Sequence, residues 1–481
     1  MRGRVIAGIL TPVLVLAGAA GYLAADAADL VPGWFTTSPE SVAPAPFLTA
    51  EPVEASAAPG TDIAPLFDPA APLPDAARIQ ALAQSLRDDP RTGPSTNVSV
   101  IDLITGQTLA DLDAADGQVP ASTTKLLTAI GVVSALGPDH RLSTVARYDA
   151  GRGEVALVAG GDMLLAAGEG APKTPDPGDT RTAAERAVGY AGLGDLADQV
   201  VASLAKRGVT SVTVVADTSA FPGPAYPVEW PAYALQQGYA APVTGLAIDV
   251  GKTNVDEEYS QRWPDPAANA ADEFAARLAE RGITVTRGKA RSGSTGDEVG
   301  RVESAPLADV VAYMLHHSDN TVAEVLSRVL AVESGVTASP QQSMAAVTAA
   351  LGALGVDTSG LELYDGAGFS TRNRIPPSVL THAIRAAVES GPTHDLLGWL
   401  AEGGLTGTLQ NRFTSSPGTG VVRAKTGSLT GVTALAGVVL TADGRPLVFA
   451  ALIDGMPYGP EKPQAAIDEF ADGLAQCGCQ P

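Results

Sequence analysis

The order of apolar and polar positions divides the chain into three stretches. Residues 5–25 are uncharged and mostly apolar, and a helix of that length, at about 1.5 Å per residue, can cross a bilayer core of about 30 Å. Residues 31–74 are rich in Pro, Ala, Ser and Thr, which predicts an extended spacer because such a segment cannot build a core. From about residue 75 the apolar positions recur at helix and strand spacing, which predicts globular structure.

Periodicity and turn residues predict the elements of the globular part. We expect helices at 76–87, 122–136, 378–389, 393–402 and 464–475, with a largely helical region from about 307. We expect strands at 97–103, 107–112, 155–158, 212–215, 283–285, 420–424, 433–440 and 447–453. Residues 141–299 differ from the rest, because short β-like runs alternate there with Gly, Pro and Asp loops.

These differences predict four parts. Residues 1–30 are a signal peptide or a membrane anchor, and 31–74 are a linker. Residues 75–140 and 300–481 form one discontinuous domain, into which 141–299 is inserted. Length alone agrees, since 481 residues exceed what one ordinary core holds.

The N-terminal charges predict export. Arg2 and Arg4 precede the apolar run and should stay on the cytoplasmic side, which places the rest of the chain outside the membrane. Residues 25–27 (Ala-Asp-Ala) fit a cleavage site, although the apolar run is long for a signal peptide. A removed signal and a retained anchor, with membrane contact, both remain open.

Composition excludes some partners and chemistries. With 31 Lys and Arg against 53 Asp and Glu, the net charge of -22 disfavours nucleic acid and anionic lipid. Cys477 and Cys479 are the only cysteines, too few for a structural zinc site, and a disulfide, a thiol pair or a modified tail stay open. The five histidines form no metal-binding motif, and we take His316 and His317 as structural. We expect neither a metal nor a cofactor.

Three short motifs carry candidate chemistry, and the first is Ser122-Thr-Thr-Lys125. At spacing i, i+3 near a helix start, the lysine amine can approach the serine hydroxyl and take its proton during nucleophilic attack. The helix N-terminus favours the negative charge that develops there. Alone, the pair also fits a helix-capping serine beside a solvated lysine.

The second motif is Ser318-Asp319-Asn320, within the helical region. The third, Lys425-Thr426-Gly427-Ser428, sits at the end of the predicted strand 420–424, which we expect to be an edge strand. Strand alternation places Lys425 and Gly427 on one face, and the absence of a side chain at Gly427 would let a substrate lie against the backbone. A turn between two strands is the plain alternative for this segment.

Together and in this order, the motifs resemble the active-site-serine, penicillin-recognising family of DD-peptidases and β-lactamases. The resemblance implies an α/β fold in which helices flank an antiparallel sheet. Positions 122 and 318 are 196 residues apart, which is similar to the insertion of the low-molecular-mass class C penicillin-binding proteins, a D-Ala-D-Ala carboxypeptidase/endopeptidase group. Further similar segments are 160–162, 217–221, 226–227, Trp230, 365–374 and 407–412. That group usually has serine where Ala367 stands, and we leave Ala367 unassigned.

By this resemblance, Ser122 is the acylated nucleophile and Lys125 its general base. Ser318 and Asn320 assist proton transfer and position the substrate, while Lys425 tunes the electrostatics and disfavours a charged Lys125. Thr426 and Ser428 hold a substrate carboxylate, Gly427 lies against the substrate, and the backbone N–H groups of Ser122 and Ser428 form an oxyanion hole.

The implied substrates are peptidoglycan stem peptides, with β-lactam antibiotics as covalent inhibitors. The expected reaction releases terminal D-alanine, and the sequence leaves open whether cross-bridges are cleaved as well. A β-lactamase, or a catalytically weak wall-binding or β-lactam sensor, is the rival reading. The Glu-x-x-Leu-Asn segment of class A β-lactamases is not found.

Overall fold

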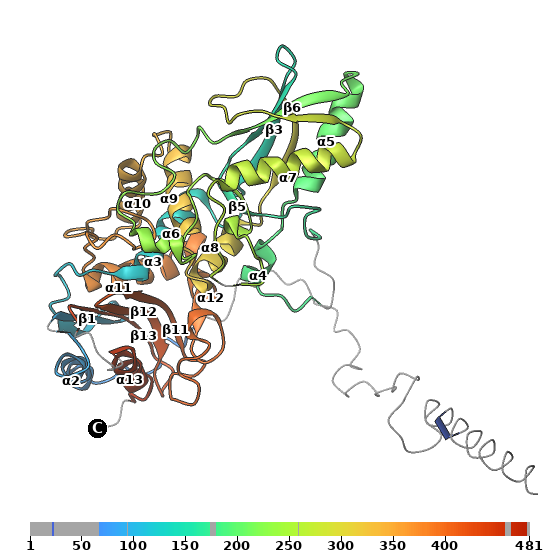
Figure 1. Ribbon diagram of the computed structural model, residues 1–481. Helices are drawn as coiled ribbons and strands as arrows, with labels where there is room; N and C mark the ends of the chain where they lie inside the picture. Colours follow the sequence, from blue (N-terminus) through green and yellow to red (C-terminus); the bar gives the residue numbers. More distant parts are fainter. Residues whose placement is uncertain are drawn as a thin grey trace, which may run out of the picture. The chain divides into compact units, whose positions relative to one another are not determined.

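The structure is a computed structural model that describes residues 22–23, 67–93, 95–173, 179–257, 259–456 and 463–478. Tyr22 and Leu23 are helical, whereas the rest of the predicted apolar segment, the spacer up to residue 66, and Cys479 lie outside the described residues. Within the described ranges, no helix combines the length and apolar character needed to cross a bilayer. All elements below belong to residues 65–481, which form one compact unit, and their labels are those of Figure 1.

A six-stranded antiparallel sheet forms the base of this unit, in the order β10-β11-β12-β13-β1-β2 (Figure 1). Its strands are β1 (Ser95–Asp102), β2 (Thr108–Leu112), β10 (Ala401–Glu402), β11 (Val422–Leu429), β12 (Val432–Leu440) and β13 (Pro446–Asp454). Strands β1 and β2 come early in the sequence of this unit, and the other four strands come near its end. The sheet therefore joins the N-terminal and C-terminal parts of residues 65–481.

Both faces of this sheet are buried, because apolar residues occupy the inner and outer positions of the central strands. On β12, Leu435 and Val439 belong to one core with helices α2 (Ala76–Arg87) and α13 (Pro463–Ala475). Ala436 and Val438 point the other way, into a core shared with α3 (Thr124–Leu136) and α11 (Pro377–Glu389). Figure 1 shows these two helix pairs on opposite sides of the sheet. The predicted fold class, an antiparallel sheet flanked by helices, is confirmed.

Helices fill the region above the second face. They are α8 (Leu307–His316), α9 (Asn320–Glu333), α10 (Pro340–Ala353) and α12 (Leu396–Trp399), with 3-10 turns at Ala121–Thr123, Gly391–Thr393 and Gly407–Leu409. Helix α3 packs against α8, α9, α10 and α11, and it is almost entirely buried. A central helix with no exposed face fixes the position of whatever stands at its N-terminus.

A second, mixed sheet is built from the region between α3 and α8, in the order β8-β6-β4-β3-β9. Its strands are β3 (Ser143–Asp149), β4 (Glu154–Val158), β6 (Ser211–Asp217), β8 (Thr284–Arg287) and β9 (Asp297–Glu303). Helices α5 (Leu193–Lys206) and α7 (Pro266–Glu280) pack on it, and the same region holds β5 (Asp162–Leu165), β7 (Leu246–Ile248), α4 (Ala183–Ala187), α6 (Ala232–Gln236) and the 3-10 turn Asp249–Gly251. The division of the chain at 141 and 299 stays a prediction.

Two local predictions differ from the structure. The predicted helix 393–402 is only the four-residue α12, and Ala401 and Glu402 pair with β11 instead. A helix cannot continue there because Leu400 is extended, at φ -86° and ψ 151°. The strand predicted at 420–424, with the Lys425–Ser428 motif at its end, begins at Val422 and continues to Leu429, so the strand includes the whole motif.

Candidate active site

Ser122 lies in a 3-10 turn, Ala121–Thr123, that leads directly into α3. Ala121 before it has a left-handed backbone, with φ of 47°, which turns the chain sharply into the helix. Lys125, one turn later, is fully buried, and its Nζ atom lies 2.9 Å from Ser122 Oγ. The predicted approach of amine to hydroxyl is therefore present in the structure.

The amine of Lys125 has two further partners. It donates to Asn320 Oδ1 and to the main-chain oxygen of Ala367, each at 2.6 Å. Both of these oxygens can only accept a hydrogen bond. When the amine is neutral, its two protons therefore go to Asn320 and Ala367, and its lone pair faces the hydroxyl of Ser122.

Burial lowers the pKa of the Lys125 amine to about 7, although the negative charges of Asp365 and Asp319 act in the opposite direction. A substantial fraction of the amine is then neutral near pH 7. A general base works best when its pKa lies near the working pH and it is within hydrogen-bond reach of the proton that it takes. Lys125 meets both conditions.

The Ser318-Asp319-Asn320 motif connects α8 to α9, and its last residue is the first residue of α9. Ser318 is left-handed, with φ of 53°, and Asp319 caps α9 by accepting from the backbone N–H of Val322 at 2.9 Å. Asn320 begins α9, and its Nδ2 donates to the main-chain oxygen of Tyr239 at 2.9 Å. This contact fixes the orientation of the Asn320 amide, with its oxygen toward Lys125.

Lys425 is fully buried on β11, and its Nζ donates to the main-chain oxygen of Thr426 at 2.9 Å. Burial lowers the pKa of Lys425 well below its usual range, and the positive charge of Lys125 lowers it further. Burial is the largest cause for both lysines, and the positive charge of Lys125 is a further cause for Lys425. The expected effect of Lys425 on the charge of Lys125 stays a prediction.

The structure gives a reason for glycine at position 427 that the sequence did not reveal. A Cβ atom at this position would lie 2.7 Å from the main-chain oxygen of Pro120 and 3.2 Å from the Cβ of Ala121. Glycine therefore lets β11 pack against the turn that carries Ser122. The predicted close approach of a substrate to this backbone stays a prediction.

The outer edge of β11 is open along the motif. Strand β10 pairs only with Arg423 and Ala424, so from Lys425 to Leu429 that edge has no strand partner among the described residues. Thr426 is partly exposed, Ser428 is exposed, and Thr426 Oγ1 donates to Thr408 Oγ1 at 3.1 Å. An extended peptide can add to such an edge through main-chain hydrogen bonds.

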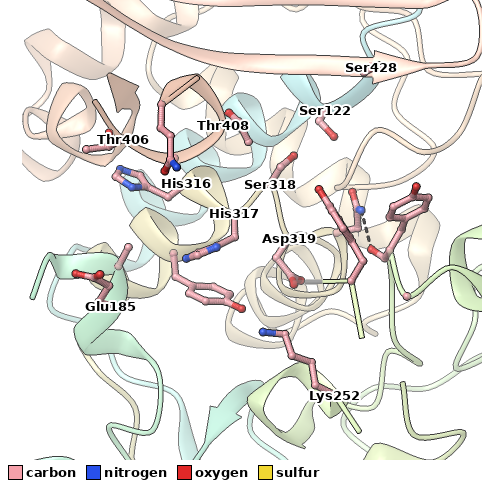
Figure 2. A pocket seen from close by; sticks show the side chains of 18 of the residues that line it. Ser122, Glu185, Lys252, His316, His317, Ser318, Asp319, Thr406, Thr408 and Ser428 are labelled. Carbon is pink, nitrogen blue, oxygen red and sulfur yellow. Dashed lines mark hydrogen bonds between the residues drawn. The ribbon is translucent and has the colours of Figure 1, made fainter. Parts of the chain in front are cut away.

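Ser122, Ser318, Asn320 and Ser428 line one cavity of about 910 Å³, and Figure 2 shows Ser122, Ser318 and Ser428 around it. The structure therefore brings the three motifs to one place. The region 141–299 supplies part of the wall, including Lys252 and a row of tyrosines. In that row, the rings of Tyr239 and Tyr259 meet edge to face at 5.1 Å.

Several supporting groups were not assigned from the sequence. The oxygens of Ala367 and Tyr239 belong to the main chain, so no residue type marks them. The loop that carries Ala367 is held by the buried Asp365, which accepts from the backbone N–H of Ser370 at 2.7 Å and from Trp230 Nε1 at 2.9 Å. Asp365 and Trp230 both lie in segments that the resemblance had singled out, and that was the available signal.

The two histidines before Ser318 line the same cavity. The ring of His317 lies 4.6 Å from that of Tyr313, and burial lowers the pKa of His316. Among the described residues, no group of three or more His, Cys, Asp or Glu side chains is arranged to hold a metal ion. Cys477 is buried near the end of the described chain.

Comparison with known proteins identifies the family. The model of the D-Ala-D-Ala carboxypeptidase 3 (S13) family matches residues 78–262 and 256–477. Carboxypeptidase DacB of Mycolicibacterium smegmatis is 34% identical over 464 residues, which cover 94% of each chain. The D-alanyl-D-alanine carboxypeptidase of Actinomadura sp. (strain R39) is 28% identical, over 81% of this chain and 83% of its own.

The solved structure of penicillin binding protein 4 from Haemophilus influenzae has the same fold, with a TM-score of 0.65 at 22% identity, over 82% of this chain and 98% of that one. The family expected from the three motifs is thus confirmed. A matched family model that covers the unit described here and a relative aligned along almost the whole sequence lead to one conclusion: the chain belongs to the D-Ala-D-Ala carboxypeptidase 3 (S13) family of serine peptidases.

Proposed function

We propose that the protein hydrolyses the terminal D-Ala–D-Ala bond of peptidoglycan stem peptides through an acyl-enzyme on Ser122. The observation that carries the proposal is the position of the Lys125 amine, 2.9 Å from Ser122 Oγ with a pKa of about 7. Carboxypeptidases among the relatives support the choice of bond.

The first step is the attack of Ser122 Oγ on the carbonyl carbon of the penultimate D-alanine. Lys125 takes the hydroxyl proton through its lone pair as the C–O bond forms. Backbone N–H groups of Ser122 and Ser428 stabilise the oxyanion, an interaction worth a few kcal/mol in the barrier. Gly427 keeps the strand that carries Ser428 close to Ser122.

The second step breaks the C–N bond and releases D-alanine. Ser318, which lines the cavity with Ser122, passes the proton from Lys125 to the leaving amine. Thr426 and Ser428 bind the terminal carboxylate with their hydroxyls. Water then attacks the acyl-enzyme, Lys125 takes the proton of this water, and Ser122 is regenerated.

A second activity, cleavage of peptide cross-bridges, is favoured by the size of the cavity. Beyond Thr408 the cavity of about 910 Å³ continues past His317 to Glu185, farther than a single D-alanine leaving group requires. An endopeptidase reaction uses the same acyl-enzyme and differs only in the longer amine that leaves.

Membership of the family supports an activity outside the cytoplasmic membrane, because peptidoglycan lies there. We infer export through the apolar segment 5–25, with membrane contact if that segment is retained. β-Lactams resemble the D-Ala–D-Ala end of the substrate, and the opening of their ring amide would acylate Ser122, so they would act as covalent inhibitors.

The test is to digest purified muropeptides and to identify the products by mass spectrometry. Free D-alanine from a pentapeptide is expected with the native protein and not with Ser122→Ala, and split dimers would show the second activity. Intact-protein mass should show a stable penicillin adduct that Ser122→Ala lacks. Rapid multiple turnover of a chromogenic cephalosporin, without D-alanine release, would instead identify a β-lactamase.

A further inference from the structure

A second, smaller cavity of about 210 Å³ lies near α4, apart from the active-site cavity. The two cavities share no lining residue. Four of the residues around the smaller one are cationic: Arg141, Lys173, Arg181 and Arg186. A chain with a net charge of -22 would not gather four cations around one small space by composition alone.

Three of the four cations have no ion-pair partner within the part of the chain that the structure describes. Arg181 pairs with Asp179 at 2.9 Å. Within the described residues, no carboxylate lies within 4.0 Å of the charged groups of Arg141, Lys173 or Arg186. Main-chain oxygens accept from all three: Arg141 Nη1 donates to Ser304 at 2.7 Å, Arg186 Nη1 to Arg181 at 2.6 Å, and Lys173 Nζ to Tyr190. These neutral acceptors hold the cations in place without forming ion pairs with them, and the single carboxyl group in the lining of the cavity is that of Asp309.

Tyr190 positions two of the cations. The Nζ atom of Lys173 lies 3.9 Å from the centre of its ring, and the Cζ atom of Arg141 lies 5.2 Å from it. Cation–π contacts of this kind attract cations without neutralising them. Asp309, which also lines the cavity, has its pKa raised by burial, with Arg186 and Arg141 acting in the opposite direction.

We propose that this cavity is a binding site for a phosphoryl oxyanion. Guanidinium groups present paired N–H donors that match phosphate oxygens, and three cations without an ion-pair partner among the described residues, against the one carboxyl group of Asp309, leave an excess of positive charge for an anion. Since one water occupies about 30 Å³ of liquid volume, a cavity of about 210 Å³ holds a phosphate group with a few waters. The group comes from free phosphate or from a phosphodiester within a polymer.

The small cavity and the active-site cavity lie against the same helix, α4. On α4, Arg186 faces the small cavity while Ala184 and Glu185 line the large one. Helix α8 carries Asp309 in its first turn and ends next to Ser318. Because none of the catalytic groups lines the small cavity, turnover of a small soluble peptide should not require the anion.

Titration calorimetry with inorganic phosphate tests this, at an ionic strength held constant with sodium chloride. We expect saturable binding of one phosphate by the native protein. The double variant Lys173→Gln/Arg186→Gln should bind at least tenfold more weakly. A matched variant, Lys206→Gln/Arg207→Gln, removes the same two charges at the end of α5 and should bind like the native protein.

A second titration with poly(glycerol phosphate) distinguishes the sources. Binding per phosphate at least tenfold tighter than that of free phosphate, and lost in the double variant, would identify a polymer; equal binding would identify the free ion. Both outcomes support an oxyanion site. The proposal is overturned if the native protein binds phosphate no better than chloride, or if the double variant binds it undiminished.

The folding of the variants is checked by thermal unfolding in phosphate-free buffer and by the rate of penicillin acylation, which should both match the native protein. Should the double variant not fold, Lys173→Glu replaces it, because Lys173 is exposed and its substitution disturbs no core. The same loss of phosphate binding is expected there, and retained binding would overturn the site.

Discussion

The main-chain oxygen of Ala367 accepts a hydrogen bond from the Nζ atom of Lys125 at 2.6 Å. The contact uses the backbone, so it constrains the course of the chain and not the side chain at position 367. It also explains why alanine can stand at position 367, where the resemblance in the sequence led us to expect serine. The loop's course depends instead on its neighbours, Asp365 and Gly368.

Gly368→Ala should therefore be far more damaging than Ala367→Ser. Gly368 has φ of 88°, and a Cβ there would lie 1.9 Å from the main-chain oxygen of Ala121, so the loop must move away from Lys125. We expect penicillin acylation of Gly368→Ala to fall by about 100-fold, because small misplacements of catalytic groups cost about that much. Ala367→Ser should stay within about threefold of the native rate; equal losses in both variants would show that the loop does not position Lys125.

The rate of acylation should depend on the charge of Lys125. Its pKa is about 7, and only the neutral amine can take the serine proton. The second-order rate constant for acylation should rise about tenfold per pH unit below 7 and level off above it. Stopped-flow acylation from pH 5 to 9 measures this. A pH-independent rate over that range would exclude Lys125 as the base.

The same lowered pKa predicts a stability effect in Lys125→Met. Between about pH 7 and the ordinary lysine pKa of 10.5, the unfolded chain binds a proton that the folded chain does not, so the native protein becomes more stable as the pH rises. The variant lacks this group. We expect Lys125→Met to be inactive yet more stable by about 1–3 kcal/mol at pH 7.

That gain should shrink as the pH rises toward 9, as measured by urea unfolding at both values. Ser122→Ala is the matched control, because it is equally inactive but keeps the amine. Its stability difference from the native protein should be nearly constant over the same range. A gain in Lys125→Met that grows with pH would contradict the assigned direction of the shift.

The sequence predicted the reacting side chains better than the groups that hold them in position. Ser122, Lys125, Ser318, Asn320 and Lys425 could be named because each contributes a side chain in a short, ordered motif. Helix 76–87 and the strands near 433–440 and 447–453 followed from their periodicity. The main-chain oxygens that orient Lys125 and Asn320 could not be found in this way, since every residue has one and only the fold selects which is used.

Local errors arose where tertiary pairing decided the structure. Residues 401–402 were predicted as the end of a helix, but they pair with Arg423 and Ala424. This pairing joins residues more than twenty positions apart, and local propensity cannot predict it. The segment 425–428 was placed at the end of a strand, and a turn at Gly427 was the alternative. In the fold, the same glycine permits close packing against Pro120, and the strand continues.

Gly427→Ala tests that packing. The added methyl group would meet the Pro120 oxygen at 2.7 Å, so β11 must shift away from the Ser122 turn. We expect a loss of about 1–3 kcal/mol in the free energy of unfolding and a fall in acylation of at least tenfold. Gly444→Ala is the control, because Gly444 is also constrained by its backbone, with φ of 79°, but has open space around it. It should lose stability and keep its acylation rate.

A buried ion pair links α9 to the loop that holds Ala367. Glu324 and Arg328 are both fully buried; Glu324 Oε1 accepts from Arg328 Nε at 3.2 Å and Oε2 accepts from the backbone N–H of Gly366 at 3.0 Å. Arg328 Nη1 and Nη2 have no hydrogen-bond partner among the described residues. Glu324→Gln should therefore cost about 3–5 kcal/mol, because it leaves a buried guanidinium without its counter-charge.

Replacing both partners removes that penalty. Glu324→Gln/Arg328→Met should be less destabilised than Glu324→Gln alone, and urea unfolding of the two single variants and the double variant forms a cycle that measures the coupling. The rate of penicillin acylation shows whether Glu324 also positions the loop. Arg328→Met keeps the hydrogen bond from Gly366 to Glu324 and should react at the native rate. Glu324→Ala loses that hydrogen bond and should react more slowly. Additive stability losses would show that the two side chains do not act as a pair.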